Sequence, residues 1–371
     1  MRRKLLFTIP NFITAGSQYV VLDILRRLDR SNFDPIVCVL KRGGIDYQVE
    51  ELEVPIIERQ FIIPTRPRST LLWRTRKAAS QFADLQSDIW HSWHYLDDYT
   101  EPLIAYQSGA RHWIYTKKNM SWGGNSWWLR SLLARRIVAM NPLMLSSFFA
   151  SPLFRYKTAL VPIGIDTRRF QPLSSMATAS WRTALSVPAH AVVVGCVANL
   201  VPIKDHFTLI RAIALAKSRP HLILVGRGDE AYIRQLQRLG HELDLEERIH
   251  FVGYIDNAEL PQFLAELDVF ALASKAEGFG AVLLEAMACE VACIATRCGG
   301  PEAIIKDGED GFLVPVGDVH QIAVRIDTLA NDVALRQQMG RDARKKVLHY
   351  FDSAKQGQLY ADLYDRLAQR V

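Results

Sequence analysis

The chain has 371 residues, of which 49% are hydrophobic and 23% charged. This composition excludes a disordered or collagen-like chain, and the length predicts two domains that each bury a core. No stretch reaches the roughly 18 consecutive apolar residues of a membrane-spanning helix, and five cysteines in mostly apolar settings indicate the reduced thiols of a cytoplasmic protein.

Charge is spread unevenly along the chain. Residues 1–165 hold 22 Lys and Arg against 13 Asp and Glu, a net charge of +9, whereas the remainder holds 23 against 26, a net charge of −3. The basic half predicts an anionic partner, and plain solubility is the alternative. An anionic membrane surface or a phosphorylated acceptor fits better than nucleic acid, because no nucleic-acid motif accompanies the charge.

Strand and helix patterns alternate through the first half. The chain opens with a strand at 4–9, a loop that ends at Gly16 and a helix at 18–28, and the alternation predicts a parallel sheet. His94 follows a predicted strand, at the carboxyl end where ligand-facing residues lie in α/β folds; a packed histidine is the alternative. The further strands predicted here are 36–40, 54–57, 89–91, 112–115 and 137–140.

The second half begins after a Ser-, Pro- and Ala-rich segment, 171–179, which predicts a linker. Tyr254 follows one of its strands and is expected at a nucleotide crevice. The final helix, 353–369, has leucines at four-residue spacing that predict one apolar stripe, Leu359, Leu363 and Leu367. The strands predicted in this half are 192–197, 222–225, 249–252, 269–273 and 291–295.

The stretch from Ser274 to Glu302 concentrates the candidate chemistry. Gly278, Phe279 and Gly280 precede a run of helix formers, and glycines before a helix expose backbone N–H groups to an anionic ligand. Glu277 stands just before these glycines, and Glu285 lies about two turns into the helix. Carboxylates suit the hydroxyls of a sugar and a ribose, so the pattern predicts a site for a nucleotide sugar.

This stretch closely resembles the donor-site signature of the family-4 retaining glycosyltransferases. The resemblance implies the GT-B fold, an α/β fold with two Rossmann-like parallel-sheet domains that face a cleft. On this basis residues 1–170 bind the acceptor, residues 171–350 bind the nucleotide sugar, and a C-terminal helix in 351–371 packs back on the first domain.

The resemblance also implies roles for single residues. Glu277 is expected to face the donor hexose, Glu285 to bind the ribose hydroxyls, and Lys204 to grip the diphosphate. Asn199 takes the place of an arginine that relatives usually carry, which removes one cationic contact. The predicted donor-binding set is Gly16, Asn199, Lys204, Tyr254, Glu277, Gly278, Phe279, Gly280 and Glu285.

One departure concerns the first domain. Many relatives carry a histidine after the strand that ends near Thr116, facing the donor sugar, and this chain has Lys117 and Lys118 there. We expect His94 or Lys118 to take over that role. The predicted catalytic set is therefore Glu277, His94, Lys204 and Lys118.

The expected function is a retaining glycosyltransferase that moves a hexose-type sugar from a UDP- or GDP-linked donor to a glycan, lipid-linked or small-molecule acceptor, in cell-surface polysaccharide or glycolipid synthesis. No metal cofactor is expected. A non-catalytic nucleotide-sugar-binding GT-B protein and a nucleotide-sugar epimerase are the alternatives, and the pair Glu277–Glu285 argues against the epimerase.

A peripheral membrane location is a further expectation. The Trp- and Arg-rich segment from Trp122 to Arg136 resembles an interfacial membrane helix, and a helix packed on its own sheet is the alternative.

Overall fold

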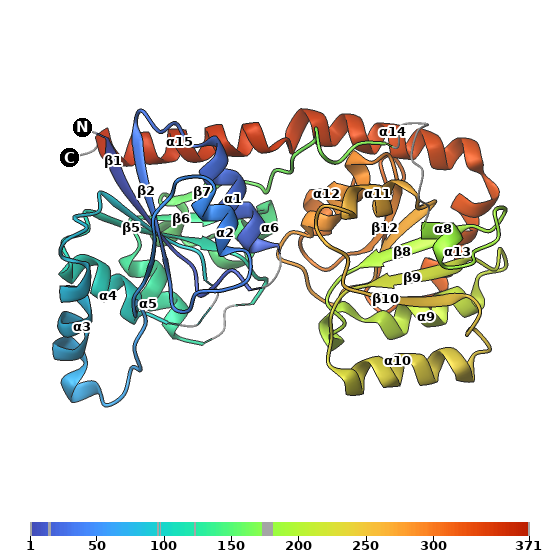
Figure 1. Cartoon of the computed structure of the whole chain (residues 1–371), viewed down its shortest axis with the longest axis horizontal. Coiled ribbons are helices and arrows are strands. Elements are labelled where there is room, and N and C mark those ends of the chain that lie inside the picture. The colour runs from blue at the N-terminus through green and yellow to red at the C-terminus, as the bar shows by residue number, and fades with distance from the viewer. Residues whose placement is uncertain are drawn as a thin grey trace. The chain divides into compact units, whose positions relative to one another are not determined.

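The computed structural model describes residues 2–13, 16–94, 96, 98–121, 124–172 and 181–369. Within it the chain divides into two compact units (Figure 1). Unit 1 comprises Met1–Gly164 and Ser353–Val371, and unit 2 comprises Ile165–Asp352. Most of the predicted linker, from residue 173 onward, lies outside the described residues.

Unit 1 is built on a seven-stranded parallel sheet in the order β3-β2-β1-β4-β5-β6-β7. Its strands are β1 (Arg3–Thr8), β2 (Phe33–Val39), β3 (Ile56–Glu58), β4 (Ile89–Ser92), β5 (His112–Lys117), β6 (Arg136–Ala139) and β7 (Thr158–Leu160). Its α-helices are α1 (Ser17–Arg27), α2 (Asp46–Glu50), α3 (Leu71–Ala79), α4 (Thr100–Gln107), α5 (Ser126–Leu133), α6 (Pro142–Phe148), α7 (Pro152–Arg155) and α15 (Ser353–Gln369).

Unit 2 is built on a six-stranded parallel sheet in the order β10-β9-β8-β11-β12-β13. Its strands are β8 (Val193–Val197), β9 (His221–Val225), β10 (Ile249–Gly253), β11 (Val269–Leu272), β12 (Ala292–Thr296) and β13 (Phe312–Val314). Its α-helices are α8 (Trp181–Ala184), α9 (His206–Leu215), α10 (Glu230–Glu242), α11 (Leu260–Ala265), α12 (Ala281–Ala288), α13 (Val319–Asn331) and α14 (Val333–Tyr350).

Central strands of both sheets are buried on both faces. Every residue of β4, β11 and β12 is buried, as expected for parallel strands that helices cover on both sides. The two predicted Rossmann-like sheets are thereby confirmed. Short strand β13 has only three residues, and no prediction was made for it.

Helix α15 belongs to unit 1, although the chain reaches it only after completing unit 2 (Figure 1). The predicted bounds 353–369 are confirmed, but the predicted stripe is wrong in part. Leu363 and Leu367 are buried, whereas Leu359 is 37% exposed. Tyr360 and Tyr364 fill the buried face instead, stacked on each other with ring centroids 5.9 Å apart.

Candidate functional site

The strand order of the second sheet reverses between β8 and β11. Ligands of open parallel sheets bind outside the carboxyl ends of the strands at such a reversal. The loop after β8 carries Lys204, and the loop after β11 carries Glu277. The fold therefore brings two residues of the predicted catalytic set, 73 positions apart, to one edge of the sheet.

These two side chains form an ion pair. Lys204 Nζ donates to Glu277 Oε1, and Ser274 Oγ donates to the same oxygen at 2.8 Å. The Lys204 side chain is 23% exposed and the Glu277 side chain 11% exposed. A ligand that reaches either group is therefore within reach of both a cation and a carboxylate.

Helix α12 begins beside this pair. Its N-cap, Gly280, has a left-handed backbone (φ +92°), and within the described residues no side chain caps the helix. The Leu283 N–H already donates to Gly280 C=O at 2.9 Å, and the other backbone N–H groups of the first turn remain donors for an anionic ligand. The helix dipole favours negative charge there. Phe279 packs inward and is 2% exposed, so Gly278 and Gly280 present backbone at this point. Glu285 follows on the same helix and is partly exposed.

Backbone hydrogen bonds join the loop after β11 to the loop after β12. Gly300 N–H donates to Glu277 C=O at 2.9 Å, and Glu277 N–H donates to Cys298 C=O at 3.1 Å. A Cβ at Gly300 would lie 2.2 Å from Phe279 C=O, so only glycine permits this approach. Glu302 Oε2 accepts the Gly299 N–H at 2.8 Å. Glu302 thus orders the turn that supports Glu277, a role that sequence analysis did not assign.

The loops after β8, β9 and β10 complete this edge. Asn199 is exposed there, and Tyr254 is 51% exposed with the Arg227 guanidinium 4.2 Å from its ring centroid. A Cβ at Gly226 would lie 1.9 Å from Ala198 C=O, so only glycine permits this close approach of the two loops. The Leu200 N–H donates to Arg227 C=O at 2.7 Å and joins the loops. Arg227 therefore supplies a cation near the predicted nucleotide crevice, a role that sequence analysis did not assign.

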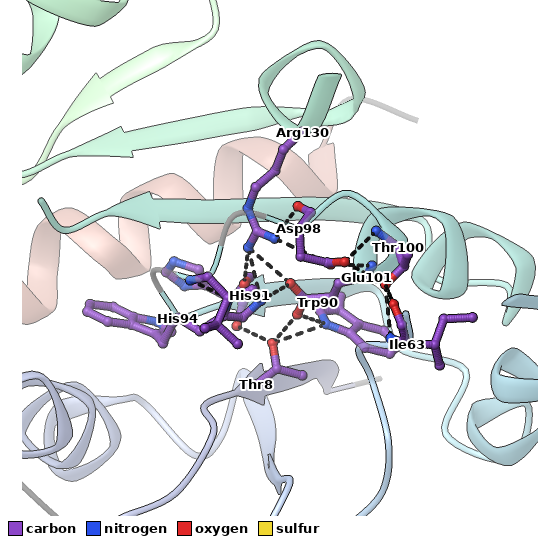
Figure 2. Close-up of polar contacts among 12 residues, drawn as sticks. Thr8, Ile63, Trp90, His91, His94, Asp98, Thr100, Glu101 and Arg130 are labelled. Atoms are coloured by element: carbon purple, nitrogen blue, oxygen red, sulfur yellow. Dashed lines mark hydrogen bonds and ion pairs between the residues drawn. The ribbon is translucent and has the colours of Figure 1, made fainter. Parts of the chain in front are cut away.

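Unit 1 has its own reversal of strand order, between β1 and β4. A buried polar network lies there (Figure 2). Glu101 is at its centre: its Oε1 accepts hydrogen bonds from Thr8 Oγ1 at 2.5 Å and Trp90 Nε1 at 3.0 Å, and its Oε2 pairs with Arg130 Nη2 at 3.0 Å. Arg130 Nη1 also donates to Asp98 C=O at 3.0 Å. Glu101 and Arg130 are both fully buried.

His94 belongs to this network. Its Nδ1 accepts the Leu96 backbone N–H at 3.2 Å, so the ring proton lies on Nε2, which donates to Glu101 Oε2 at 2.7 Å. Burial and the Arg130 charge lower the pKa of His94. The ring is fully buried and both nitrogens are engaged. The geometry therefore favours the packed alternative for His94 over direct contact with a sugar.

The two lysines after β5 have different settings. Buried Lys117 donates to Asn119 C=O at 2.8 Å and to Ser121 C=O, and its ammonium lies 4.7 Å from the Trp127 ring centroid. It therefore ties the loop down. Lys118 is partly exposed and donates to Trp93 C=O at 2.6 Å. Trp93 directly precedes His94 in the sequence. Burial lowers the pKa of both ammonium groups to about 7.

Gly16 is the N-cap of α1, where its C=O accepts the Val20 N–H at 3.1 Å. A Cβ at Gly16 would meet no described atom within 4 Å, so steric crowding does not explain this glycine. Thr14 and Ala15 of the same loop lie outside the described residues.

The predicted sites fall on two separate units. Gly16, His94 and Lys118 lie in unit 1. The predicted donor-binding residues of unit 2 are Asn199, Lys204, Tyr254, Glu277, Gly278, Phe279, Gly280 and Glu285.

The Trp- and Arg-rich segment forms α5. Trp127 and Arg130 of α5 are buried, which for these two residues favours the alternative of a helix packed on its own sheet. Trp122 and Gly123 lie outside the described residues. None of the helices in the described ranges is long and apolar enough to cross a bilayer.

All five cysteines lie in the described ranges, and none forms a disulfide. Four of them are buried, and Cys298 is partly exposed.

Comparison with solved structures establishes the fold. A structure of Anabaena Alr3699/HepE in complex with UDP and glucose is 21% identical, with a TM-score of 0.85 over 98% of this chain and all of that chain. A glycosyltransferase from Rickettsia africae ESF-5 is 18% identical, with a TM-score of 0.86 over the whole of both chains. These likenesses confirm the GT-B fold.

Sequence relatives are similar over shorter regions. An N-acetyl-alpha-D-glucosaminyl L-malate synthase of Bacillus anthracis is 41% identical over 38% of this chain. A GDP-mannose-dependent alpha-(1-6)-phosphatidylinositol monomannoside mannosyltransferase of Mycolicibacterium smegmatis is 34% identical over 55% of this chain. This chain spans 36% and 55% of the length of these two relatives.

A family model described as "Glycosyl transferases group 1" matches residues 178–346, which include all the predicted donor residues of unit 2. This match covers less than half of the chain, and it agrees with the glycosyltransferase names of the relatives and with the shared fold.

Proposed function

We propose that this chain is a retaining glycosyltransferase of the family-4 type, which moves a hexose-type sugar from a nucleoside-diphosphate donor to an acceptor hydroxyl. The observation that carries the proposal is the Lys204–Glu277 ion pair beside the uncapped start of α12. This arrangement offers positive charge for a diphosphate and a carboxylate for sugar hydroxyls at one point of the sheet.

The reaction places charge where these groups can stabilise it. When the bond from the sugar carbon to the diphosphate breaks, negative charge grows on the leaving phosphate oxygens. The Lys204 ammonium and the α12 N–H groups stabilise that charge in the transition state more than in the bound donor, which accelerates bond breaking. Glu277 orients the hexose, and Glu285 binds the ribose.

The proposal includes no metal cofactor, because Lys204 and the helix N-terminus supply the positive charge that the diphosphate needs. Transfer is expected to be unchanged when a chelator is added. A loss of activity on chelation, restored by a divalent cation, would overturn this part of the proposal.

The acceptor is proposed to be a glycan or a lipid-linked sugar, since relatives include a phosphatidylinositol mannoside mannosyltransferase. The proposed place of reaction is the cytoplasm, and the free cysteines support a reducing compartment.

A screen of UDP- and GDP-sugars for thermal stabilisation tests the donor, because a ligand that binds only the folded state raises its melting temperature. Relatives named for UDP-glucose complexes and for GDP-mannose justify both bases. The stabilising donor is then incubated with and without acceptor sugars, and NMR assigns the anomeric configuration of the product. An inverted product would contradict retention, and a changed sugar still linked to nucleotide would indicate an epimerase. Donor binding with neither sugar transfer nor slow hydrolysis of the donor would indicate a non-catalytic module.

Glu285→Gln tests the ribose assignment. Losing charge-assisted hydrogen bonds to two hydroxyls is expected to weaken nucleoside-diphosphate binding by about 2–3 kcal/mol, measured by calorimetry. Glu242→Gln is the matched control, since Glu242 is an exposed carboxylate at the last residue of α10. Equal affinity in the Glu285 variant and its control would contradict the assignment.

A further inference from the structure

Helix α3 of unit 1 exposes apolar side chains to solvent. Leu72 is 67% exposed and Trp73 is 65% exposed, while Leu71, Ala78 and Ala79 of the same helix are buried. The helix thus already packs one face on unit 1, and its second apolar face, which carries Leu72 and Trp73, is exposed. Apolar side chains gathered in this way mark a binding surface more often than scattered ones do.

The same segment is strongly basic. Residues 60–83 contain five Lys and Arg and no Asp or Glu. Four of these cations are exposed, and among the described residues no ion pair engages them: Arg66, Arg68, Arg76 and Lys77. In Figure 1 α3 lies beside α4 at the edge of unit 1.

The cations and the apolar pair form one surface. Arg74 donates from Nη1 to Pro64 C=O at 2.7 Å and from Nη2 to Pro67 C=O at 2.9 Å, which fastens the preceding loop to the helix. That loop carries Arg66 and Arg68. On the helix itself, the Lys77 ammonium lies 5.7 Å from the Trp73 ring centroid.

We propose that residues 66–77, the α3 surface, dock this protein onto an anionic lipid bilayer. Tryptophan and leucine enter the boundary between headgroups and acyl chains, and the surrounding cations contact the lipid phosphates. Nucleic acid fits less well, because Leu72 contributes nothing to binding a phosphate backbone. The inference does not depend on donor chemistry: vesicle binding needs no nucleotide, so its failure would leave the transferase proposal standing.

Unit 1 offers a second surface of similar composition, which serves as a matched control. Trp128 and Leu132 of α5 are 52% and 38% exposed. Arg135 follows α5 closely in the sequence, Arg155 lies on α7, which contacts α5, and both arginines are exposed. We favour the α3 surface because its apolar pair is more exposed and its basic segment includes the four exposed cations named above.

The test is co-sedimentation of the full chain with phosphatidylcholine vesicles, with and without phosphatidylglycerol. Two variants remove the same number of apolar and basic side chains. The α3 variant is Leu72→Ser, Trp73→Ser, Arg76→Gln and Lys77→Gln; the control variant is Trp128→Ser, Leu132→Ser, Arg135→Gln and Arg155→Gln.

The wild-type chain is expected to bind the anionic vesicles at low salt and to dissociate as salt approaches 1 M, where the Debye length is about 3 Å. The α3 variant is expected to lose binding about tenfold or more, and the control variant less than about twofold. Melting curves check that both variants fold. A further variant, Arg66→Gln with Arg68→Gln, changes only the loop before α3 and is expected to weaken vesicle binding as well. Absent wild-type binding, unchanged binding of the α3 variant, or a larger loss in the control variant would each overturn the proposal.

Discussion

Single residues in the interior of unit 1 carry more charge than a core usually tolerates. Glu101 and Arg130 are fully buried, and Arg130 also stacks 4.8 Å from the Trp113 ring centroid. Burial raises the pKa of Glu101, but contacts with His94, Arg130 and Thr8 outweigh it and lower the pKa to about 2. The carboxylate therefore stays ionised, and each charge in the network depends on its partner.

Glu101→Gln tests this dependence. Removing one partner leaves the Arg130 guanidinium buried with only Asp98 as a more distant counter-charge, at 3.9 Å, so unit 1 is expected to lose about 3–5 kcal/mol of unfolding free energy. Denaturant unfolding measures the loss, with Glu51→Gln on the exposed surface as the control. The double variant Glu101→Gln with Arg130→Met is expected to recover part of it, and purely additive effects would contradict the coupling.

His91 predicts a pH dependence of stability. Its Nδ1 and Nε2 lie 2.8 Å from Tyr364 Oη and Thr116 Oγ1, and burial lowers its pKa to about 3. An unfolded histidine gains a proton near pH 6.5, which the folded ring does not accept until about pH 3. The neutral His91 ring therefore makes its full contribution to the unfolding free energy above pH 6.5, and this contribution is lost as pH falls toward 3. The unfolding free energy changes by up to about 1.4 kcal/mol per pH unit in this range.

Unfolding free energies of the wild type and of His91→Gln between pH 7 and pH 5 check this prediction. The variant is expected to show the shallower slope. Identical slopes would mean that His91 gains its proton in the folded state as readily as in the unfolded chain.

The proposed donor residues rest on a local sequence signal. Glycines and carboxylates within one turn and helix encode the Glu277–Glu285 stretch, so a short segment suffices. The Glu101–Arg130 pair was not predicted, because its two residues lie 29 positions apart in the sequence, on α4 and α5. They meet only when the chain has folded. The available signal was an acidic residue in an otherwise uncharged helix, followed by no Asp or Glu until residue 166.

At the scale of elements, the last helix of the chain, α15, stabilises unit 1, which also contains the first strand. Tyr364 contacts Phe7 and Phe33 edge-on, with ring centroids 6.2 and 6.0 Å apart, and Arg3 forms an ion pair with Asp365. The first strand and the last helix of the chain therefore share one core. Strand positions followed from apolar runs, whereas the occupants of the α15 stripe did not, because aromatic residues with polar tips replace one of the expected leucines.

Two leucines of α15 provide a matched comparison. Leu363 is 3% exposed and Leu359 is 37% exposed on the same helix. Leu363→Ala is expected to cost about 2–5 kcal/mol of unit 1 stability through lost burial and a residual cavity, whereas Leu359→Ala is expected to cost less than about 1 kcal/mol. Denaturant unfolding of both variants measures the difference, and equal costs would show that α15 does not seal the core of unit 1.

At the scale of the whole molecule, the two units differ in how the chain builds them. Unit 1 needs both ends of the chain, Met1–Gly164 and Ser353–Val371, whereas unit 2 is one continuous segment, Ile165–Asp352. Unit 2 also holds every predicted donor-binding residue except Gly16. Expressing this single continuous segment therefore tests the proposed donor site separately from unit 1.

We expect residues 165–352, expressed alone, to fold and to bind the same nucleoside diphosphate as the full chain, because Lys204, Glu277 and α12 all lie within this segment. Transfer to an acceptor is expected to be lost, since unit 1 is absent. Calorimetry measures binding, and Glu285→Gln in the isolated segment is the control for binding at the proposed site. A folded segment without nucleotide affinity would show that unit 1 contributes essential donor contacts, and would direct attention to Gly16 and Lys118, two of the three predicted site residues that the segment lacks.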